Sequence, residues 1–285
     1  MIKQGSSITR TGREQLLLPG SKKWVNLCPN QMKNCRMDTV KAYFTAKEVE
    51  RAQLLPVPRH VAIIPDGNRR WAKNQGWKAV FGHKRGSQVL VDIVGAAIEL
   101  KIKILTVYTF STENWRRPSD EIASLMHLLK DYLISQRSKM VAQGVRLSHI
   151  GNVDKLPMDV QEELKKSEKA TERGEGLTLV LAINYGGRDE LMRSVSRMAL
   201  ACSQGSLDPS LITEELFKSY LDTAHYPDPD LVIRTSGEFR LSNFLLWQLA
   251  YAEIHVSSTL WPDYTPREFC QTIELYQKRE QRLGE

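Results

Sequence analysis

The strongest constraint on the fold of this chain is an alternation of apolar strand-like runs with stretches of helical spacing. The runs "RHVAIIP" at residues 59–65 and "IKILTVYTF" at 102–110 are apolar and β-branched, which is typical of buried strands. Apolar residues between the two runs recur at helical spacing: Val89, Leu90, Ile93, Ala97 and Leu100. A strand, a helix and a strand in this order favour a right-handed crossover within a parallel sheet.

The alternation continues along the chain. Further strand-like runs are "VRLSHIG" at 145–151, "LTLVLAINYGG" at 177–187 and "DLVIRT" at 230–235, with polar helical stretches between them. With no internal repeat or low-complexity tract, this order predicts a single α/β domain over residues 46–285, with a central, mostly parallel sheet flanked by helices.

Two helices can be outlined in more detail. Ser119 is expected to cap a helix whose first turn carries two acidic residues, and whose apolar stripe is Ile122, Leu125, Met126, Leu129 and Leu133. A charged helix is expected from Pro266 to about Leu283.

Composition narrows the functional classes only partly. The net charge of +7 permits nucleic acid, anionic membranes or phosphorylated substrates as partners, and a basic solvated surface explains it equally well. The four cysteines are scattered without metal-ligand spacing, which argues against a metal site built on sulfur. The apolar runs fall short of the roughly 20 residues needed to cross a bilayer.

Residues 1–45 differ from the rest of the chain. They are basic, poor in acids and without clean periodicity, which fits either a transit segment or a disordered extension. The predicted compartment is therefore the plastid or the cytoplasm, with endoplasmic reticulum association as a further option.

The stretch "IIPDGNRRWA" at residues 63–72 carries the first candidate site. A buried strand is followed here by an acid, a glycine and two arginines. These residues fall beyond the carboxyl end of the strand, where open α/β sheets bind ligands. Gly67 allows close approach of the backbone, and the following helix start favours an anion. Because Asp66 cannot hold a phosphate without a cation between them, the stretch suggests a diphosphate bound with Mg²⁺. An Asp-Gly turn before a basic helix face is the alternative reading.

Two further loops are expected beyond the carboxyl ends of the strands, on the same side of the sheet as this stretch. "FSTENWRRP" at 110–118 leaves the neighbouring strand, and "RTSGEFRLSNFLLWQLAYAE" at 234–253 leaves a later one. In the second loop, Arg234, Arg240 and Ser242 are expected to form a fork for a second phosphate group.

Together these motifs resemble the cis-prenyltransferases, the family of undecaprenyl and dehydrodolichyl diphosphate synthases. The resemblance covers about residues 57–285 in order and with similar spacing, through "HVAIIPDGNRRWA", "FGHK", "FSTENWRRP", "NYGGR" and "RTSGEFRLSNFLLWQLAYAE". Arg69, where many bacterial members carry glycine, gives the first motif a plant-like form.

The resemblance implies that isopentenyl diphosphate is added to an allylic diphosphate, with a new Z double bond and release of diphosphate. Asp66 and Glu253 would bind Mg²⁺, and Asp66, Asn68 and Asn114 would be catalytic. An amide is a poor base, so the leaving diphosphate is the alternative proton acceptor. The substrate-binding residues implied by the resemblance are Gly67, Asn68, Arg69, Arg70, Trp71, His83, Phe110, Ser111, Thr112, Glu113, Trp115, Arg117, Arg234, Arg240, Leu241, Ser242, Arg282 and Gly284.

The resemblance also implies an apolar tunnel for the growing hydrocarbon, lined by helix faces such as 122–129. Thr109 and Leu177 are candidates for its floor, and plain core packing is the alternative for each lining residue. Product length does not follow from the sequence.

The ending Arg282–Leu283–Gly284 matches a family feature that crosses into the partner's active site, which favours a homodimer. Peripheral membrane contact through the product is a further expectation, and nucleic acid is not expected as a partner. The alternatives are a non-catalytic accessory subunit of a prenyltransferase complex, or a basic nucleic-acid-binding module.

Overall fold

The computed structural model describes residues 15–17, 24–26 and 42–279, and divides the chain into two units, 1–42 and 43–285. In the first unit, β1 (Gln15–Leu17) pairs antiparallel with β2 (Trp24–Asn26), a ribbon that the sequence did not predict. The second unit begins slightly earlier than residue 46, because the Tyr43 backbone N–H donates to Glu99 Oε1 over 2.8 Å.

The second unit is built on one six-stranded sheet in the order β5-β6-β4-β3-β7-β8, and every neighbouring pair is parallel. The predicted α/β domain with a mostly parallel sheet is therefore confirmed. The strands are β3 (His60–Ile64), β4 (Ile104–Ser111), β5 (Val145–Ile150), β6 (Leu177–Tyr185), β7 (Leu231–Arg234) and β8 (Glu253–Val256).

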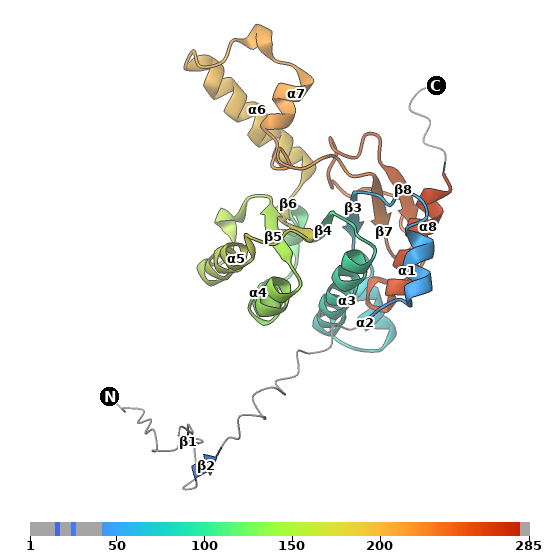
Figure 1. The fold of residues 1–285 in the computed structure, drawn as a ribbon. Coiled ribbons are helices and arrows are strands. Elements are labelled where there is room, and N and C mark those ends of the chain that lie inside the picture. The colour runs from blue at the N-terminus through green and yellow to red at the C-terminus, as the bar shows by residue number, and fades with distance from the viewer. Residues whose placement is uncertain (1–14, 18–23, 27–41, 280–285) are drawn as a thin grey trace. The chain divides into compact units, whose positions relative to one another are not determined.

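Helices α2 to α7 lie in the connections from β3 to β7, whereas α1 precedes the six-stranded sheet and α8 follows it (Figure 1). They are α1 (Ala46–Ala52), α2 (Asn68–Asn74), α3 (Ala79–Glu99), α4 (Ser119–Ala142), α5 (Met158–Thr171), α6 (Gly187–Ser203), α7 (Glu214–Ser219) and α8 (Pro266–Gln277). None of the helices in the described residues combines the length and apolarity that a bilayer span requires.

Two predicted helix ends differ from the structure. The capping position of α4 is Pro118 rather than Ser119, which is already the first helical residue and so cannot cap it. The last helix, α8, ends at Gln277 rather than near Leu283, and residues 280–285 lie outside the described residues.

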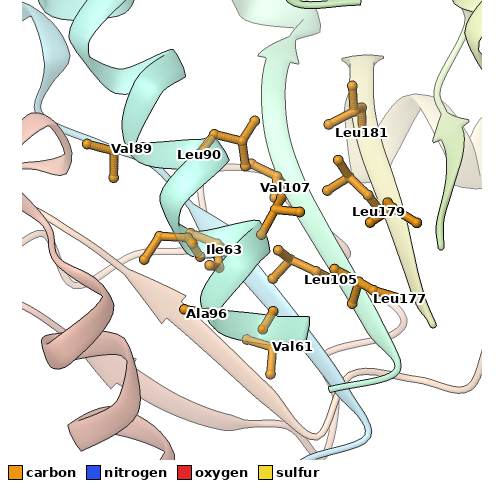
Figure 2. Close-up of a cluster of buried hydrophobic side chains, with 14 of the residues drawn as sticks. Val61, Ile63, Val89, Leu90, Ala96, Leu105, Val107, Leu177, Leu179 and Leu181 are labelled. Carbon is orange, nitrogen blue, oxygen red and sulfur yellow. The ribbon is translucent and has the colours of Figure 1, made fainter. Parts of the chain in front are cut away.

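The two faces of the sheet are covered differently. Alternate strand residues such as Val61 and Ile63 face a core shared with α3, α4, α5 and α8, and Figure 2 shows these two side chains along α3, with Val61 near Ala96. Ala62 and Ile64 face a second core that is completed by Phe244, Leu245 and Leu249. The second face is thus closed largely by the irregular segment 235–252.

The strand order places a topological switch point at β3. The chain passes from β3 to β4 on one side and later returns to β7 on the other. Because ligands of open α/β sheets bind beyond the carboxyl ends of the strands at such a point, the loops after β3, β4 and β7 are the place to look for a site.

Candidate active site

A cavity of about 610 Å³ opens at this switch point. Its walls come from the β3–α2 turn, from α3 and α4, from the loop after β4 and from the segment after β7. The predicted residues that line it are Asp66, Gly67, Asn68, Arg69, Arg70, His83, Ser111, Glu113, Asn114, Arg117, Arg234 and Ser242. The structure therefore brings together most of the residues that the sequence singled out.

The turn from β3 into α2 has a conformation that favours glycine. Gly67 has a φ of 109°, and a Cβ at this position would lie 2.9 Å from Leu260 Cδ2 and 3.1 Å from its backbone. The backbone of Asp66 is fixed from the β7 side, because its N–H donates to Thr235 Oγ1 over 2.9 Å. The polar residues of the turn are thereby fixed at the cavity wall.

Asp66 is the centre of an ionic cluster. Arg234 Nη2 donates to Asp66 Oδ2 over 2.7 Å, and Arg70 Nη2 lies 3.6 Å from Asp66 Oδ1. Partial burial raises the pKa of the Asp66 carboxyl, but the hydrogen bond and charge of Arg234 and the charge of Arg70 outweigh it, so the pKa is lowered overall. Asp66 is therefore a charged carboxylate at neutral pH.

Arg234 does not form the predicted fork with Arg240. The side chain of Arg234 is only 6% exposed, and besides Asp66 it donates to Ser242 Oγ over 2.7 Å and to the Arg240 carbonyl oxygen. Arg240 itself is exposed and pairs with Glu238 outside the 610 Å³ cavity. The prediction of a two-arginine fork is wrong for this conformation, because both Nη groups of buried Arg234 are already engaged, by Asp66 on one side and by Ser242 and the Arg240 carbonyl oxygen on the other. Only its Nε is left buried without a partner among the described residues.

His83 lies against the arginines of the cavity wall. Burial, together with the positive charges of Arg117 and Arg69, lowers the pKa of its imidazole to about 4. Arg117 Nη1 also pairs with Glu121 over 3.1 Å. His83 is consequently neutral at physiological pH, and the cations of this wall are the two arginines.

The loop after β4 is closed by a hydrogen-bonded turn. Asn114 Oδ1 accepts from the Ser111 backbone N–H over 3.2 Å, and the Ser111 side chain accepts in return from the Asn114 backbone. Glu113 Oε1 accepts from Asn243 Nδ2 over 2.8 Å, which joins this loop to the segment after β7. The amide oxygen of Asn114 therefore closes the turn and is not presented as a proton acceptor.

A smaller apolar cavity of about 110 Å³ adjoins the polar one. The two share Asn68, His83, Thr109 and Leu125 in their walls, and the other lining residues include Leu90, Val107, Phe110, Met126, Leu129, Tyr132, Leu181 and Trp261. Asn68 Oδ1 is buried at this junction and has no hydrogen-bond partner among the described residues.

The predicted tunnel residues are partly confirmed. Leu125, Met126 and Leu129 line the apolar cavity, whereas Ile122 packs against the main core. Of the two floor candidates, Thr109 lines both cavities, but Leu177 lies in the core and lines neither.

Several predicted substrate contacts lie outside the polar cavity. Trp71 Nε1 donates to Asp263 over 2.8 Å, and Trp115 Nε1 donates to Asn184 over 2.7 Å while its ring packs edge-on against Phe110. Thr112 and Leu241 do not line the polar cavity either. These side chains support the walls of the site. Arg282 and Gly284 lie outside the described residues.

The structure does not bring Glu253 to Asp66. Glu253 begins β8 level with Leu231, the first residue of β7, whereas Asp66 lies beyond the carboxyl end of β3. Its carboxylate pairs instead with Arg279. The prediction that the two acids approach one metal ion is therefore wrong within a single chain, because Asp66 lies beyond the carboxyl end of its strand and Glu253 at the amino end of its own.

Sequence reasoning missed several residues that build the site. Ser236 accepts from Arg70 Nη2 over 2.5 Å, and the Trp261 N–H groups donate to the carbonyl oxygens of Asp66 and Gly86, both over 2.9 Å. Gly237 beside Ser236 was a usable signal, whereas Trp261 lies outside the stretches that resemble the family's motifs. Asn243, which follows Ser242 in the chain, also lines the polar cavity.

A polar cavity with arginines and a charged carboxylate, continued by an apolar cavity, defines an α/β enzyme for a substrate with an anionic head and a hydrocarbon tail. Residues 64–284 match the family described as "Putative undecaprenyl diphosphate synthase". The chain belongs to this family and is a cis-prenyltransferase.

Individual relatives agree with this assignment. The chain is 46% identical over 228 residues to an isoprenyl transferase of Chlorobaculum tepidum, covering 80% of this chain and 86% of that one. It is 45% identical over 230 residues to an isoprenyl transferase of Aquifex aeolicus, covering 81% and 97%. Among solved structures, lavandulyl diphosphate synthase from Lavandula x intermedia in complex with dimethylallyl diphosphate matches with a TM-score of 0.79 and 35% identity, over 80% of this chain and 99% of that one.

Proposed function

We propose that the paired cavities join isopentenyl diphosphate to an allylic diphosphate, form a Z-prenyl diphosphate and release diphosphate. The observation that carries this proposal is the junction of the two cavities at Asn68, His83, Thr109 and Leu125. A diphosphate seated among the arginines would direct its hydrocarbon into the apolar cavity. Both parts of one amphiphilic substrate are thereby accommodated.

The allylic diphosphate is assigned to the wall formed by Gly67, Arg69, Arg70 and Arg117. Cations fixed before the reaction stabilise the charge that develops on the leaving diphosphate as the allylic carbon–oxygen bond breaks. Neutral His83 supplies a hydrogen-bonding group without adding charge. The second diphosphate is assigned to the side of Ser242 and Asn243, where Arg240 would exchange Glu238 for the substrate.

We further propose that Asp66 holds Mg²⁺ together with a diphosphate. The described residues include no group of three or more His, Cys, Asp or Glu side chains able to hold a metal by themselves. Mg²⁺ fits this arrangement because it is bound through one or two carboxylates plus substrate phosphates. When bound, it would supply positive charge to the leaving diphosphate. Asp66, charged and 29% exposed, fits as its protein ligand.

The final proton is assigned to an oxygen of the leaving diphosphate. Asn68, with its buried and unsatisfied amide oxygen at the cavity junction, is positioned to accept a hydrogen bond from a reacting group. A carboxamide is too weakly basic to take the proton itself.

We propose that the protein is a homodimer joined near β8. The sheet ends at this strand, and the segment around it exposes large apolar side chains, with Phe239 at 83%, Tyr251 at 88% and Ile254 at 42% exposure. An open strand edge beside exposed aromatic side chains favours a partner surface. Light scattering should show a dimer, and Tyr251→Glu should shift it to monomer; a monomeric parent would contradict the proposal.

We propose a plastid location on the basis of the basic, acid-poor residues 1–45. Fused to a fluorescent protein, residues 1–45 should direct it to plastids of plant cells, and diffuse cytoplasmic fluorescence would contradict this proposal. A long, dolichol-type product would require contact with a membrane surface, which flotation with lipid vesicles during turnover would detect.

The decisive experiment incubates the pure protein with isopentenyl diphosphate, Mg²⁺ and, separately, dimethylallyl, geranyl, farnesyl and geranylgeranyl diphosphate. Chromatography of the products should show elongation with at least one primer, and EDTA should abolish it. No product with any primer would contradict the proposal. Activity gained only on adding a cell extract would instead support the accessory-subunit alternative.

A further inference from the structure

The segment that carries Ser242 and Asn243 has an unusual backbone. Ser242, Asn243 and Leu245 have φ angles of 51°, 64° and 45°, in the left-handed region that L residues rarely adopt. Such conformations persist only where the surrounding structure over-determines them. Residues 242–248, which we call the strained segment, therefore need support from outside.

Part of that support comes from the start of α6. The Gly187 N–H donates to the Asn243 carbonyl oxygen over 2.6 Å, and the Arg188 N–H donates to Asn243 Oδ1 over 2.9 Å. A Cβ at Gly187 would lie 2.8 Å from Leu246 Cγ, so the helix packs directly on the segment.

The other end of the strained segment is held by Glu190. This carboxylate is fully buried and lines neither cavity. Its Oε2 accepts from Gln248 Nε2 over 3.0 Å and from the Tyr185 hydroxyl over 2.6 Å, and its Oε1 accepts from the Asp222 N–H over 2.9 Å. One side chain thus ties α6, β6 and the turn at 222 to the strained segment.

The same network reaches the cavity by a second route. The Tyr108 hydroxyl donates to the carbonyl oxygens of Tyr185 and Ser242, over 3.1 Å and 3.4 Å. A displacement at Glu190 would therefore act on Ser242 through both Gln248 and Tyr185.

We propose that Glu190 is a positioning residue for catalysis, which holds the strained segment so that Ser242 and Asn243 face the second diphosphate. This inference rests on the proposed function, in which the second diphosphate is that of isopentenyl diphosphate. It predicts an effect on one substrate and not on the other, which a residue that only stabilised the fold would not produce.

The test compares Glu190→Ala with Glu190→Gln and with Ser194→Ala. Ser194 is a matched control, since it is also buried on α6, and its hydroxyl donates to the backbone carbonyl oxygens of Glu190 and Tyr220 but makes no bond to the strained segment. Glu190→Ala should raise KM for isopentenyl diphosphate by about 10- to 100-fold, the size expected from a small misplacement, and change KM for the allylic diphosphate less than about twofold. Glu190→Gln should recover most of the loss, because Gln248 Oε1, buried without a partner in the described part of the chain, can rotate to accept from the new amide.

An unchanged KM for isopentenyl diphosphate in Glu190→Ala, or an equal rise in Ser194→Ala, would overturn the proposal. If Glu190→Ala does not fold, Gln248→Leu breaks the same contact from the other side and should raise the same KM. If the parent protein forms no product, the proposed function fails, and positioning is then judged from calorimetric binding of inorganic pyrophosphate. The same ranking of variants would support it, and equal affinities would refute it.

Discussion

Replacing Asp66 by alanine and by asparagine separates two roles of this carboxylate. Alanine leaves the guanidinium of Arg234, whose side chain is 6% exposed, without its counter-charge. Breaking a buried pair in this way costs about 3–5 kcal/mol. Because Asp66 is 29% exposed and water can partly replace it, we expect a loss of stability below this range, about 2–3 kcal/mol, and a fall in Tm of roughly 5–10 °C.

Asparagine keeps an oxygen that accepts from Arg234, so its cost should be about 1 kcal/mol. Both variants lose the charge of the proposed metal ligand, and kcat/KM should fall about 100-fold or more, equivalent to ~2.7 kcal/mol. Thermal and urea unfolding measure the first effect, and incorporation of labelled isopentenyl diphosphate measures the second. An alanine variant as stable as the parent would refute the structural role, and an asparagine variant with near-normal turnover would refute the metal role.

Three further predictions concern the walls of the cavities. Because the pKa of His83 falls from 6.5 to about 4 on folding, the unfolded chain binds a proton that the folded chain does not. Stability should therefore decrease by about 3 kcal/mol as pH falls from 6.5 to 4, and His83→Asn should remove this part of the dependence in urea unfolding at pH 5 and 7; parallel profiles for parent and variant would contradict it. Gly86→Ala should lower stability by about 1–3 kcal/mol and also kcat, because the new Cβ would lie 2.4 Å from Asn68 Oδ1 and 2.8 Å from Trp261 Cδ1; unaltered denaturation and turnover would show that the site relaxes. The apolar cavity of about 110 Å³ is smaller than a 150 Å³ cavity that holds benzene, so Tyr132→Ala should lengthen the product seen by chromatography, and an identical product would place the limit elsewhere.

The fold and the cradle at residues 66–70 could be predicted because their signals are local. A continuous apolar run such as that of β3 predicts a buried parallel strand. The acid, glycine and arginines that directly follow it must then lie at the carboxyl end of the strand, where ligands bind, however the rest of the chain packs.

The positions of Glu253 and Arg240 could not be predicted in this way. Arg240 belongs to the irregular stretch between β7 and β8, and Glu253 begins β8 directly after that stretch. No periodicity in the stretch relates sequence separation to distance in space. Glu253 is placed by the register of β8 on β7, and Arg240 by a backbone path with several positive φ angles. The pairing of Arg234 with Asp66 was missed for a similar reason, since the motifs suggested only that each would meet a ligand.

The bond between Asp66 and Arg234 joins residues 168 positions apart along the chain. During synthesis at about 5–20 residues per second, the acid would emerge roughly 10–30 s before the arginine that neutralises it. A nascent chain therefore carries the first half of the proposed anion-binding site, at the β3–α2 turn, for many seconds before the second half exists. Any product of premature termination before β7 lacks the second half. Catalytic competence therefore depends on the synthesis of β7 and of the segment that follows it.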